Sequence, residues 1–239
     1  MPGMTDLGQL LDEQTGAALE ADANYHRALI EALRQLLEHG SAPGWQLLQA
    51  DAQRLEARSR TTRPFRALIF RGGGRRRWQQ RLRDPAAALA ARLSRLIAAG
   101  VAAPPALLQG RVAGLPFLVW REAPGRPLSD FLAAAADGGQ LAPDAARRND
   151  ALITLGEALA RLHAVGLALA VADPASWRVE AAPGHALRVV LAEPTALVAP
   201  WPRRGRRPDL GAWAAALDLD DSAAAALRRG AQDRESLRH

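Results

Sequence analysis

Arginine dominates the residues of this chain that could carry chemistry. All 31 lysine-or-arginine positions are arginine, and the 239 residues include neither lysine nor cysteine. Schiff-base chemistry and phosphate binding by a P-loop or kinase-type lysine are therefore excluded. Cysteine nucleophiles, disulfides and thiolate metal sites are excluded as well. A GC-rich genome would favour arginine over lysine, but that bias does not explain the loss of a lysine that a reaction requires.

The positive charge is concentrated in one stretch of the sequence. Between Arg54 and Arg83 the chain carries eleven arginines and a single acid, Glu56, whereas residues 1–40 carry seven acids and two arginines. Such a block can bind phosphate, anionic lipid headgroups or nucleic acid, and it is also typical of a solvated face. Nucleic-acid-binding surfaces interleave aromatic and basic side chains, and few aromatics lie in this block. The pattern therefore does not favour a nucleic-acid partner.

Other reactive side chains do not fall into recognisable arrangements. The five histidines show no ligand spacing, so we predict no metal site: His26, His39, His163, His185 and His239. Neither G-x-S-x-G nor G-x-G-x-x-G occurs, which argues against a hydrolase or a Rossmann site. The six tryptophans are spread one per predicted element, which indicates core anchors rather than a stacking platform.

Periodicity and capping residues predict the elements that must position any site. The predicted helices are Thr15–Glu38, 84–99 with Asp84 as N-cap and Gly100 after its end, one capped by Ser129, one from Asp150 to about Ala164, Leu210–Leu217 and Ser222–Arg229. The predicted strands lie within 44–60, 63–71, 106–112, 115–122, 166–172, 176–180 and 186–193, with a turn at Gly114. We expect an α+β protein with an acidic helical extension (1–42), a β-rich N-terminal lobe (43–124) and a helix-rich C-terminal lobe (125–239).

Four segments in this order carry a resemblance to a known family. They are AAGVAAP (98–104), FLVWREAPGRPLSDFL (117–132), LGEALARLHAVG (155–166) and RRPDLGAW (206–213). Together they resemble the end of the regulatory helix, the hinge, the helix before the catalytic loop, and a late helix of the C-terminal lobe in the lipopolysaccharide (Kdo/heptose) kinase family. The resemblance implies a two-lobed protein-kinase-like fold, with Glu122 at the hinge.

The same resemblance places the family's phosphotransfer residues on unsuitable side chains. Kinase-type catalysis uses a strand lysine with a helix glutamate, a catalytic aspartate, a metal-binding asparagine and a metal-binding aspartate. The matching positions here are Ala67, Ile69 or Arg71 for the lysine, Leu89 for its glutamate, Val171, Ser176 and Ala192. An arginine fork is not interchangeable with an ammonium, and valine and alanine bind neither proton nor metal.

Two nearby carboxylates could substitute for the missing ones. Asp173 lies two residues past Val171, and Glu193 follows Ala192. Using Asp173 as the catalytic aspartate puts Arg178 at the magnesium position, and both Asp-Pro and Glu-Pro are also ordinary turn and strand-exit sequences. We therefore expect no catalytic residue and no cofactor. If activity remains, the resemblance implies ATP and Mg²⁺, with Arg71, Glu122 and Ser176 as nucleotide-site residues.

Three functions follow as hypotheses. The first is a catalytically inactive pseudokinase of this family, with a regulatory or scaffolding role in lipopolysaccharide biosynthesis and an envelope-biosynthesis protein or anionic glycolipid as partner. The second is a divergent active ATP-dependent sugar or lipid kinase that uses Asp173 and Glu193. The third is an arginine-rich adaptor for anions or nucleic acid. The sequence shows no secretory signal and no apolar run of ~18–20 residues, so we expect a cytoplasmic protein with peripheral contact at the inner membrane.

Overall fold

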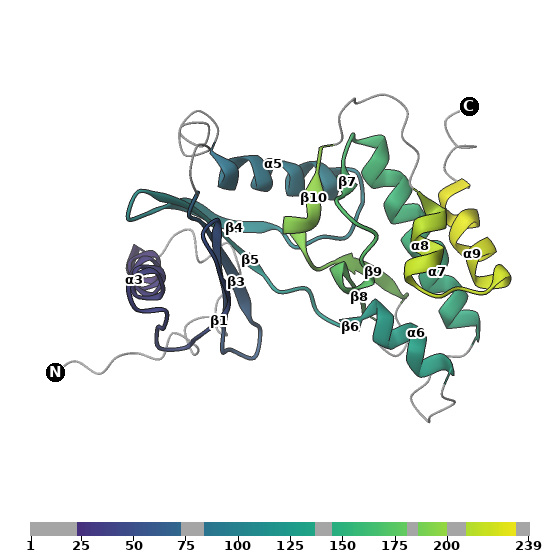
Figure 1. Ribbon diagram of the computed structural model, residues 1–239, viewed down its shortest axis with the longest axis horizontal. Helices are drawn as coiled ribbons and strands as arrows, with labels where there is room; N and C mark the ends of the chain where they lie inside the picture. Colours follow the sequence, from purple (N-terminus) through teal and green to yellow (C-terminus); the bar gives the residue numbers. More distant parts are fainter. Residues whose placement is uncertain (1–22, 73–83, 137–144, 181–185, 200–208, 233–239) are drawn as a thin grey trace. The chain divides into compact units, whose positions relative to one another are not determined.

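The computed structural model describes residues 23–72, 84–136, 145–180, 186–199 and 209–232 (Figure 1). The chain divides into two compact units. Unit 1 runs to Ala91 and includes Pro105–Glu122, and unit 2 contains Arg92–Pro104 and the chain from Ala123 onward. Helix α5 (Pro85–Ala98) crosses this division.

Unit 1 is built on a five-stranded antiparallel sheet with the order β1-β2-β3-β5-β4. Its strands are β1 (Trp45–Ala50), β2 (Arg54–Ser59), β3 (Phe65–Phe70), β4 (Ala106–Val112) and β5 (Leu115–Arg121). The predicted strands 63–71, 106–112 and 115–122 and the turn at Gly114, which has a φ of 78°, are confirmed. The single strand predicted within 44–60 is instead a hairpin of β1 and β2.

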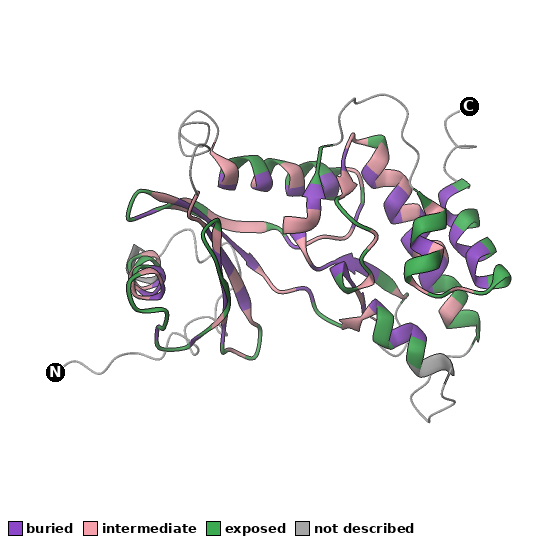
Figure 2. Cartoon of the chain, viewed as in Figure 1, coloured by how far each residue is buried: buried purple, intermediate pink, exposed green. Residues whose placement is uncertain are grey.

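Helix α3 (Ala23–His39) packs on one face of this sheet (Figure 2). The apolar stripe of the helix supplies Leu29, Leu33 and Leu36 to the core. The strands supply alternate residues such as Phe65, Ala67, Ile69, Phe117 and Val119, because successive side chains of a strand point to opposite faces. The helix that the sequence grouped with an extension thus shares one core with the sheet.

Helix α5 begins and ends as its capping residues predict. The Oδ1 atom of Asp84 accepts hydrogen bonds from the N–H groups of Ala86 and Ala87, at 2.9 and 3.2 Å. These bonds satisfy two of the donors that a helix N-terminus leaves unpaired. Gly100, which follows the helix, has a φ of 76°, a conformation that glycine adopts without strain.

Unit 2 combines four helices with two small sheets among the described residues. The helices are α6 (Leu128–Ala136), α7 (Ala145–Ala164), α8 (Leu210–Ala216) and α9 (Asp221–Gln232). One sheet has the order β6-β8-β9, with β6 (Arg126–Pro127), β8 (Trp177–Glu180) and β9 (Arg188–Leu191). The other pairs β7 (Ala168–Leu169) with β10 (Leu197–Val198), and 3-10 turns span Pro174–Ser176 and Pro194–Ala196.

Three local predictions in unit 2 are wrong. Ser129 is not the N-cap of α6, which begins at Leu128, and its hydroxyl donates to Asp130 Oδ1 at 3.2 Å. Asp150 lies inside α7, because the alanines and arginines of 145–148 are strong helix formers that extend the helix upstream. Of the predicted strand 166–172, only Ala168 and Leu169 pair with a neighbour.

Helices α7 and α9 approach so closely that glycine is required at two positions. A Cβ atom at Gly156 of α7 would overlap the carbonyl oxygen of Leu227 on α9. A Cβ at Gly230 of α9 would overlap the carbonyl oxygen of Ile153 on α7. Each helix therefore presents a glycine to the backbone of the other.

Buried tryptophans anchor both cores. Trp45 and Trp120 of unit 1 and Trp177 and Trp213 of unit 2 are at most 5% exposed, as the sequence predicted. Predictions that concern residues 15–22, Trp78, His185, Trp201, 206–208 and His239 fall outside the described residues. Within the described parts of the chain, no helix is long and apolar enough to cross a membrane.

Candidate functional site

The face of the unit 1 sheet opposite α3 carries a buried ion pair. Glu56 on β2 and Arg66 on β3 form this pair, with side chains only 5% and 11% exposed. The guanidinium carbon of Arg66 also lies 5.9 Å from the ring centroid of Trp120 on β5, its cross-strand neighbour. A positive charge over an indole face is attracted by the ring quadrupole. Glu56 and Trp120 therefore both contact Arg66.

A second ion pair lies at the end of β5. The Nε atom of Arg58 donates to Glu122 Oε2 at 2.5 Å, and the side chain of Glu122 is 9% exposed. The backbone N–H of Glu122 donates to the carbonyl of Pro64 at 2.8 Å. Glu122, predicted at the hinge as a nucleotide-site residue, is therefore engaged with Arg58 inside unit 1.

The three residues predicted at the position of the strand lysine, Ala67, Ile69 and Arg71, belong to neither of these ion pairs. Ala67 and Ile69 are fully buried on the α3 side of the sheet. Arg71 follows β3, where its backbone N–H donates to Gln53 at 2.8 Å and its guanidinium donates to the carbonyl of Asp51 at 3.3 Å. Leu89, predicted in place of the lysine's glutamate partner, is a buried apolar residue of α5.

In unit 2, the predicted catalytic-loop residues form a tight turn. The carboxylate of Asp173 accepts hydrogen bonds from the N–H of Ala175 at 3.0 Å and from the hydroxyl of Ser176 at 3.3 Å. It thereby caps the 3-10 turn Pro174–Ser176. Ser176 is 1% exposed, whereas Val171 is 71% exposed and points into solvent. The two polar side chains of this segment therefore bond to each other.

Ala192 and Glu193, which follow β9, lie against this turn. The carbonyl of Ser176 accepts from the N–H groups of Ala192 and Glu193, at 2.8 and 3.3 Å. The side chain of Ala192 is 4% exposed and has no ligand atom.

These residues do not fit the Mg²⁺ ions that a kinase would hold. Magnesium is held by carboxylates, phosphates and water in near-octahedral geometry. Valine, serine and alanine at positions 171, 176 and 192 supply one hydroxyl between them, and Asp173 accepts that hydroxyl. Nowhere in the described ranges do three histidine, aspartate or glutamate side chains gather in a way that could hold a metal ion.

The elements and their order define an α+β protein-kinase-like fold, as the sequence predicted. The structure of WaaP in complex with acyl carrier protein matches this chain with a TM-score of 0.57 and 20% identity, covering 85% of this chain and 89% of that one. A structure of WbdD matches with a TM-score of 0.41 and 24% identity over 68% of this chain and 35% of that one. The kinase domain of Mycobacterium tuberculosis PknI matches with a TM-score of 0.41 and 15% identity over 79% and 75%.

The similarity to WaaP shows the fold of the chain. Its activity has to be inferred from the side chains at the site. The sequence matches no protein-family model and no curated protein sequence.

The Glu56–Arg66 pair is the feature that sequence reasoning missed. A signal for it was present, because Glu56 is the single acid in the block of eleven arginines. Only the strand register identifies Arg66 as its partner. The register sets Glu56 opposite Leu68, which lies two residues from Arg66 on the same face of the sheet.

Proposed function

We propose that this chain is a pseudokinase of the lipopolysaccharide kinase family, which keeps the fold and lacks phosphotransfer. Its role is regulatory or scaffolding, in cell-envelope lipopolysaccharide biosynthesis. The observation that carries the proposal is the turn at Asp173, whose carboxylate bonds to Ala175 and Ser176. The envelope context rests on the four resembling segments and on the fold shared with WaaP.

Electrostatics argue against catalysis by the remaining groups. Phosphoryl transfer depends almost wholly on positioned charges that stabilise the transferring group. Asp173 accepts two hydrogen bonds within its own turn, and Val171 and Ala192 carry no charge. A carboxylate that serves as a turn cap is constrained to the geometry of the turn rather than that of an acceptor hydroxyl.

Arg66, the arginine on β3, is also already paired with an acid. Arg66 pairs with Glu56 and its side chain is 11% exposed, so a phosphate would approach a buried charge that a carboxylate already neutralises. Removing one partner of a buried pair leaves the other charge uncompensated, which costs several kcal/mol. Arg66 therefore supports the sheet rather than a nucleotide phosphate.

Phosphotransfer assays test the proposal directly. Purified protein is incubated with ATP and either Mg²⁺ or Mn²⁺, with and without lipopolysaccharide core oligosaccharide, and ADP release and labelled product are followed. We expect no turnover above the protein-free blank, and the same trace for Asp173→Ala. Turnover that Asp173→Ala or Glu193→Ala abolishes would establish the divergent active kinase instead. A thermal-shift titration with ATP and Mg²⁺ shows separately whether nucleotide binds.

The partner we favour is an acidic envelope-biosynthesis protein or an anionic glycolipid, met by a cytoplasmic protein that contacts the inner membrane peripherally. The chain has a formal net charge of +6, and Arg60 and Arg63 are exposed in unit 1. WaaP was solved in complex with acyl carrier protein, which makes that protein a concrete probe.

Co-elution with acyl carrier protein and flotation with vesicles that contain an anionic glycolipid test the two partners, with phosphatidylcholine vesicles as control. We expect at least one to bind and Arg60→Glu/Arg63→Glu to weaken it. Binding of a DNA oligonucleotide that weakens steeply with salt, with neither of these partners bound, would support the adaptor hypothesis.

A further inference from the structure

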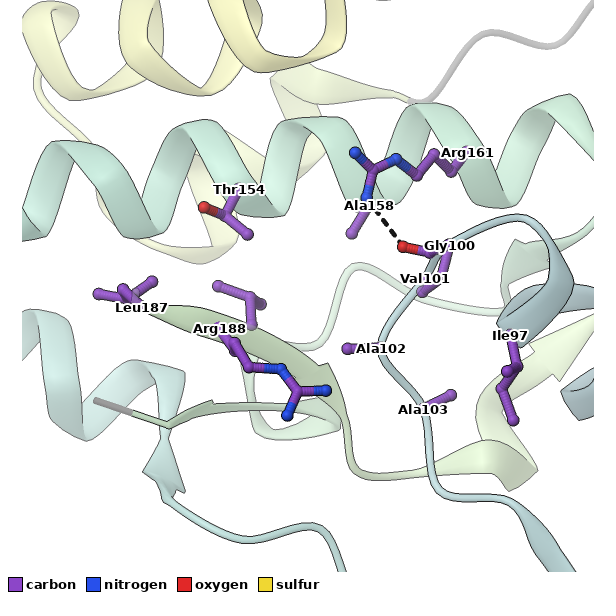
Figure 3. Close-up of a pocket in the computed structure, with 11 residues that line it drawn as sticks. Ile97, Gly100, Val101, Ala102, Ala103, Thr154, Ala158, Arg161, Leu187 and Arg188 are labelled. Carbon is purple, nitrogen blue, oxygen red and sulfur yellow. Dashed lines mark hydrogen bonds between the residues drawn. The ribbon is translucent and has the colours of Figure 1, made fainter. Parts of the chain in front are cut away.

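The arginines that line the cavity of unit 2 are already bonded within the protein. This cavity has a volume of about 380 Å³ and is lined by the chain after α5, one face of α7 and the start of β9 (Figure 3). Arg161 donates to the carbonyl of Gly100 at 2.8 Å and to Glu157 at 2.7 Å. Arg188 pairs with Glu180 at 3.4 Å. The two cations at this cavity are therefore compensated.

One end of the unit 1 sheet carries arginines of a different kind. Arg60 and Arg63 lie in the loop 60–64 between β2 and β3, and both are exposed. Neither forms an ion pair or a side-chain hydrogen bond with any residue that the structure describes. Arg121, at the end of β5, has its guanidinium carbon 5.1 Å from the ring centroid of Phe65, its cross-strand neighbour. A guanidinium in contact with a ring keeps N–H donors for another partner.

Backbone hydrogen bonds fix the loop that holds these side chains. The Oγ atom of Ser59 accepts from the N–H of Phe65 at 2.8 Å, which joins the two ends of the loop. The carbonyl of Pro64 accepts from the N–H of Glu122 at 2.8 Å, which holds the loop beside the end of β5. Because the backbone is ordered in advance, a ligand would pay less to order it on binding.

The three arginines lie close enough to act together on one anion. Arg60 and Arg63 are three residues apart, so their Cα atoms are separated by no more than about 11 Å. Phe65, two residues after Arg63, lies opposite Arg121, at a Cα separation of about 5 Å in an antiparallel pair. These separations are comparable with the Debye length of about 10 Å at about 0.1 M salt, so the charges are only partly screened from one another.

The acids described in unit 1 do not neutralise these arginines, because each already has a partner. Four contact other arginines and two accept from backbone N–H groups: Glu31 and Glu38 contact Arg34, Glu56 contacts Arg66, Glu122 contacts Arg58, Asp51 accepts from Gln53 and Arg54, and Asp84 accepts from Ala86 and Ala87. Glu122 directly follows Arg121 but is 9% exposed and held by Arg58. An excess of positive charge therefore remains at this end of the sheet.

We propose that Arg60, Arg63 and Arg121 form a binding site for a phosphate monoester. A side-chain carboxylate has two oxygens and one charge, so a single guanidinium fork satisfies it. A phosphate monoester carries a charge of about −1.5 to −2 at about pH 7 and three acceptor oxygens, and can therefore bond to several arginines at once. The site specifies the group that the partner of the proposed function presents and thus rests on that proposal.

Two probes carry the same group on different molecules. Flotation compares phosphatidylcholine vesicles that contain phosphatidic acid, a monoester, with vesicles that contain phosphatidylglycerol, a diester, at equal surface charge. Phosphorus NMR follows a titration of soluble glucose 6-phosphate with the full chain. We expect more protein on the phosphatidic acid vesicles, or saturable glucose 6-phosphate binding with a dissociation constant of about 1 mM or lower. The first result identifies a lipid as the bearer of the phosphate, and the second identifies a soluble sugar.

Neutral substitutions locate the site. Arg63→Gln and Arg121→Gln should each weaken binding at least about fivefold, because each removes a charge-assisted hydrogen bond to the phosphate. Arg27→Gln makes the same change in net charge at an exposed arginine of α3 and should alter binding less than about twofold. Thermal unfolding of each variant shows that the fold is retained.

Three results would overturn the proposal. They are absence of binding to both probes, equal binding to the monoester and diester vesicles without binding of glucose 6-phosphate, and equal losses in Arg27→Gln and Arg63→Gln. Phosphotransfer assays report on the pseudokinase separately. A chain without turnover that binds acyl carrier protein but no phosphate monoester would keep the proposed function and lose this site.

Discussion

The buried Glu56–Arg66 pair gives the sharpest test of how this sheet is stabilised. Arg66→Met keeps the length and packing of the side chain but removes its charge. Glu56 then stays 95% buried, with its charge no longer compensated by this arginine, because the rest of the strand holds it in place. Glu56→Met is the reciprocal change, since it removes the Glu56 carboxylate from the guanidinium of Arg66.

The expected loss follows from the burial of the two side chains, at 5% and 11% exposure. Removing one partner of a buried pair typically costs 3–5 kcal/mol, and the contact of Arg66 with Trp120 adds roughly 0.5–1 kcal/mol. For a chain of this size, 1 kcal/mol shifts the melting temperature by about 2–4 °C. We therefore expect Arg66→Met to lower it by at least about 6 °C.

The assay is thermal and urea unfolding followed by circular dichroism. A matched control is Arg34→Met on α3, which breaks the Arg34–Glu31 pair, where both side chains are about half exposed at 50% and 46%. Pairs of that kind contribute little to stability, because water screens the two charges. The double variant Glu56→Met/Arg66→Met should recover much of the loss, since replacing both buried charges with apolar groups is often nearly neutral.

The reasoning fails if Arg66→Met costs no more than Arg34→Met. It also fails if the double variant loses the sum of the two single losses, because additive effects would show that Glu56 and Arg66 do not interact.

Three further predictions concern packing, capping and titration. Gly156→Ala should destabilise the chain by about 1–3 kcal/mol, because its Cβ would overlap the carbonyl of Leu227. Gly211→Ala in α8, where the nearest atom is 3.4 Å away, should be neutral or stabilising, and equal unfolding midpoints for the two variants would contradict this. Asp84→Ala should cost about 1 kcal/mol in urea unfolding through loss of the α5 N-cap, whereas Asp84→Asn should retain most of it. The backbone N–H groups of Arg54 and Gln53 hold the pKa of Asp51 below its ordinary value of 3.8, so its contribution to stability is present above that value and is lost as the pH falls through the folded-state pKa. An NMR titration that found an ordinary pKa for Asp51 would refute this.

Local features of the fold were predictable from the sequence because they depend on neighbouring residues. Asp84, Pro85 and Gly100 bound α5 as predicted, and alternation placed Phe65, Ala67 and Ile69 on one buried face. The errors at Ser129 and Asp150 have a common cause. Serine and aspartate are good N-caps, but they are also tolerated inside a helix when the residues before them extend it.

The candidate site was less predictable because it depends on contacts between distant segments. The sequence identified Asp173 and Ser176, but not that their side chains would bond to each other. Nor could it show Arg66 paired with Glu56, which requires the register of β2 against β3. The position of β9 at the end of its sheet follows from strand order, which periodicity alone does not reveal.

The reciprocal glycines of α7 and α9 constrain how this sequence can evolve. Where arginine and lysine would serve equally well, a change in genome composition can replace one by the other. At Gly156 and Gly230 no such exchange exists, because each faces a main-chain carbonyl of the opposite helix, and a carbonyl cannot be mutated away. A larger residue at either position is tolerated only if the two helices separate. Descendants that keep this helix crossing should therefore keep both glycines while the arginines around them change.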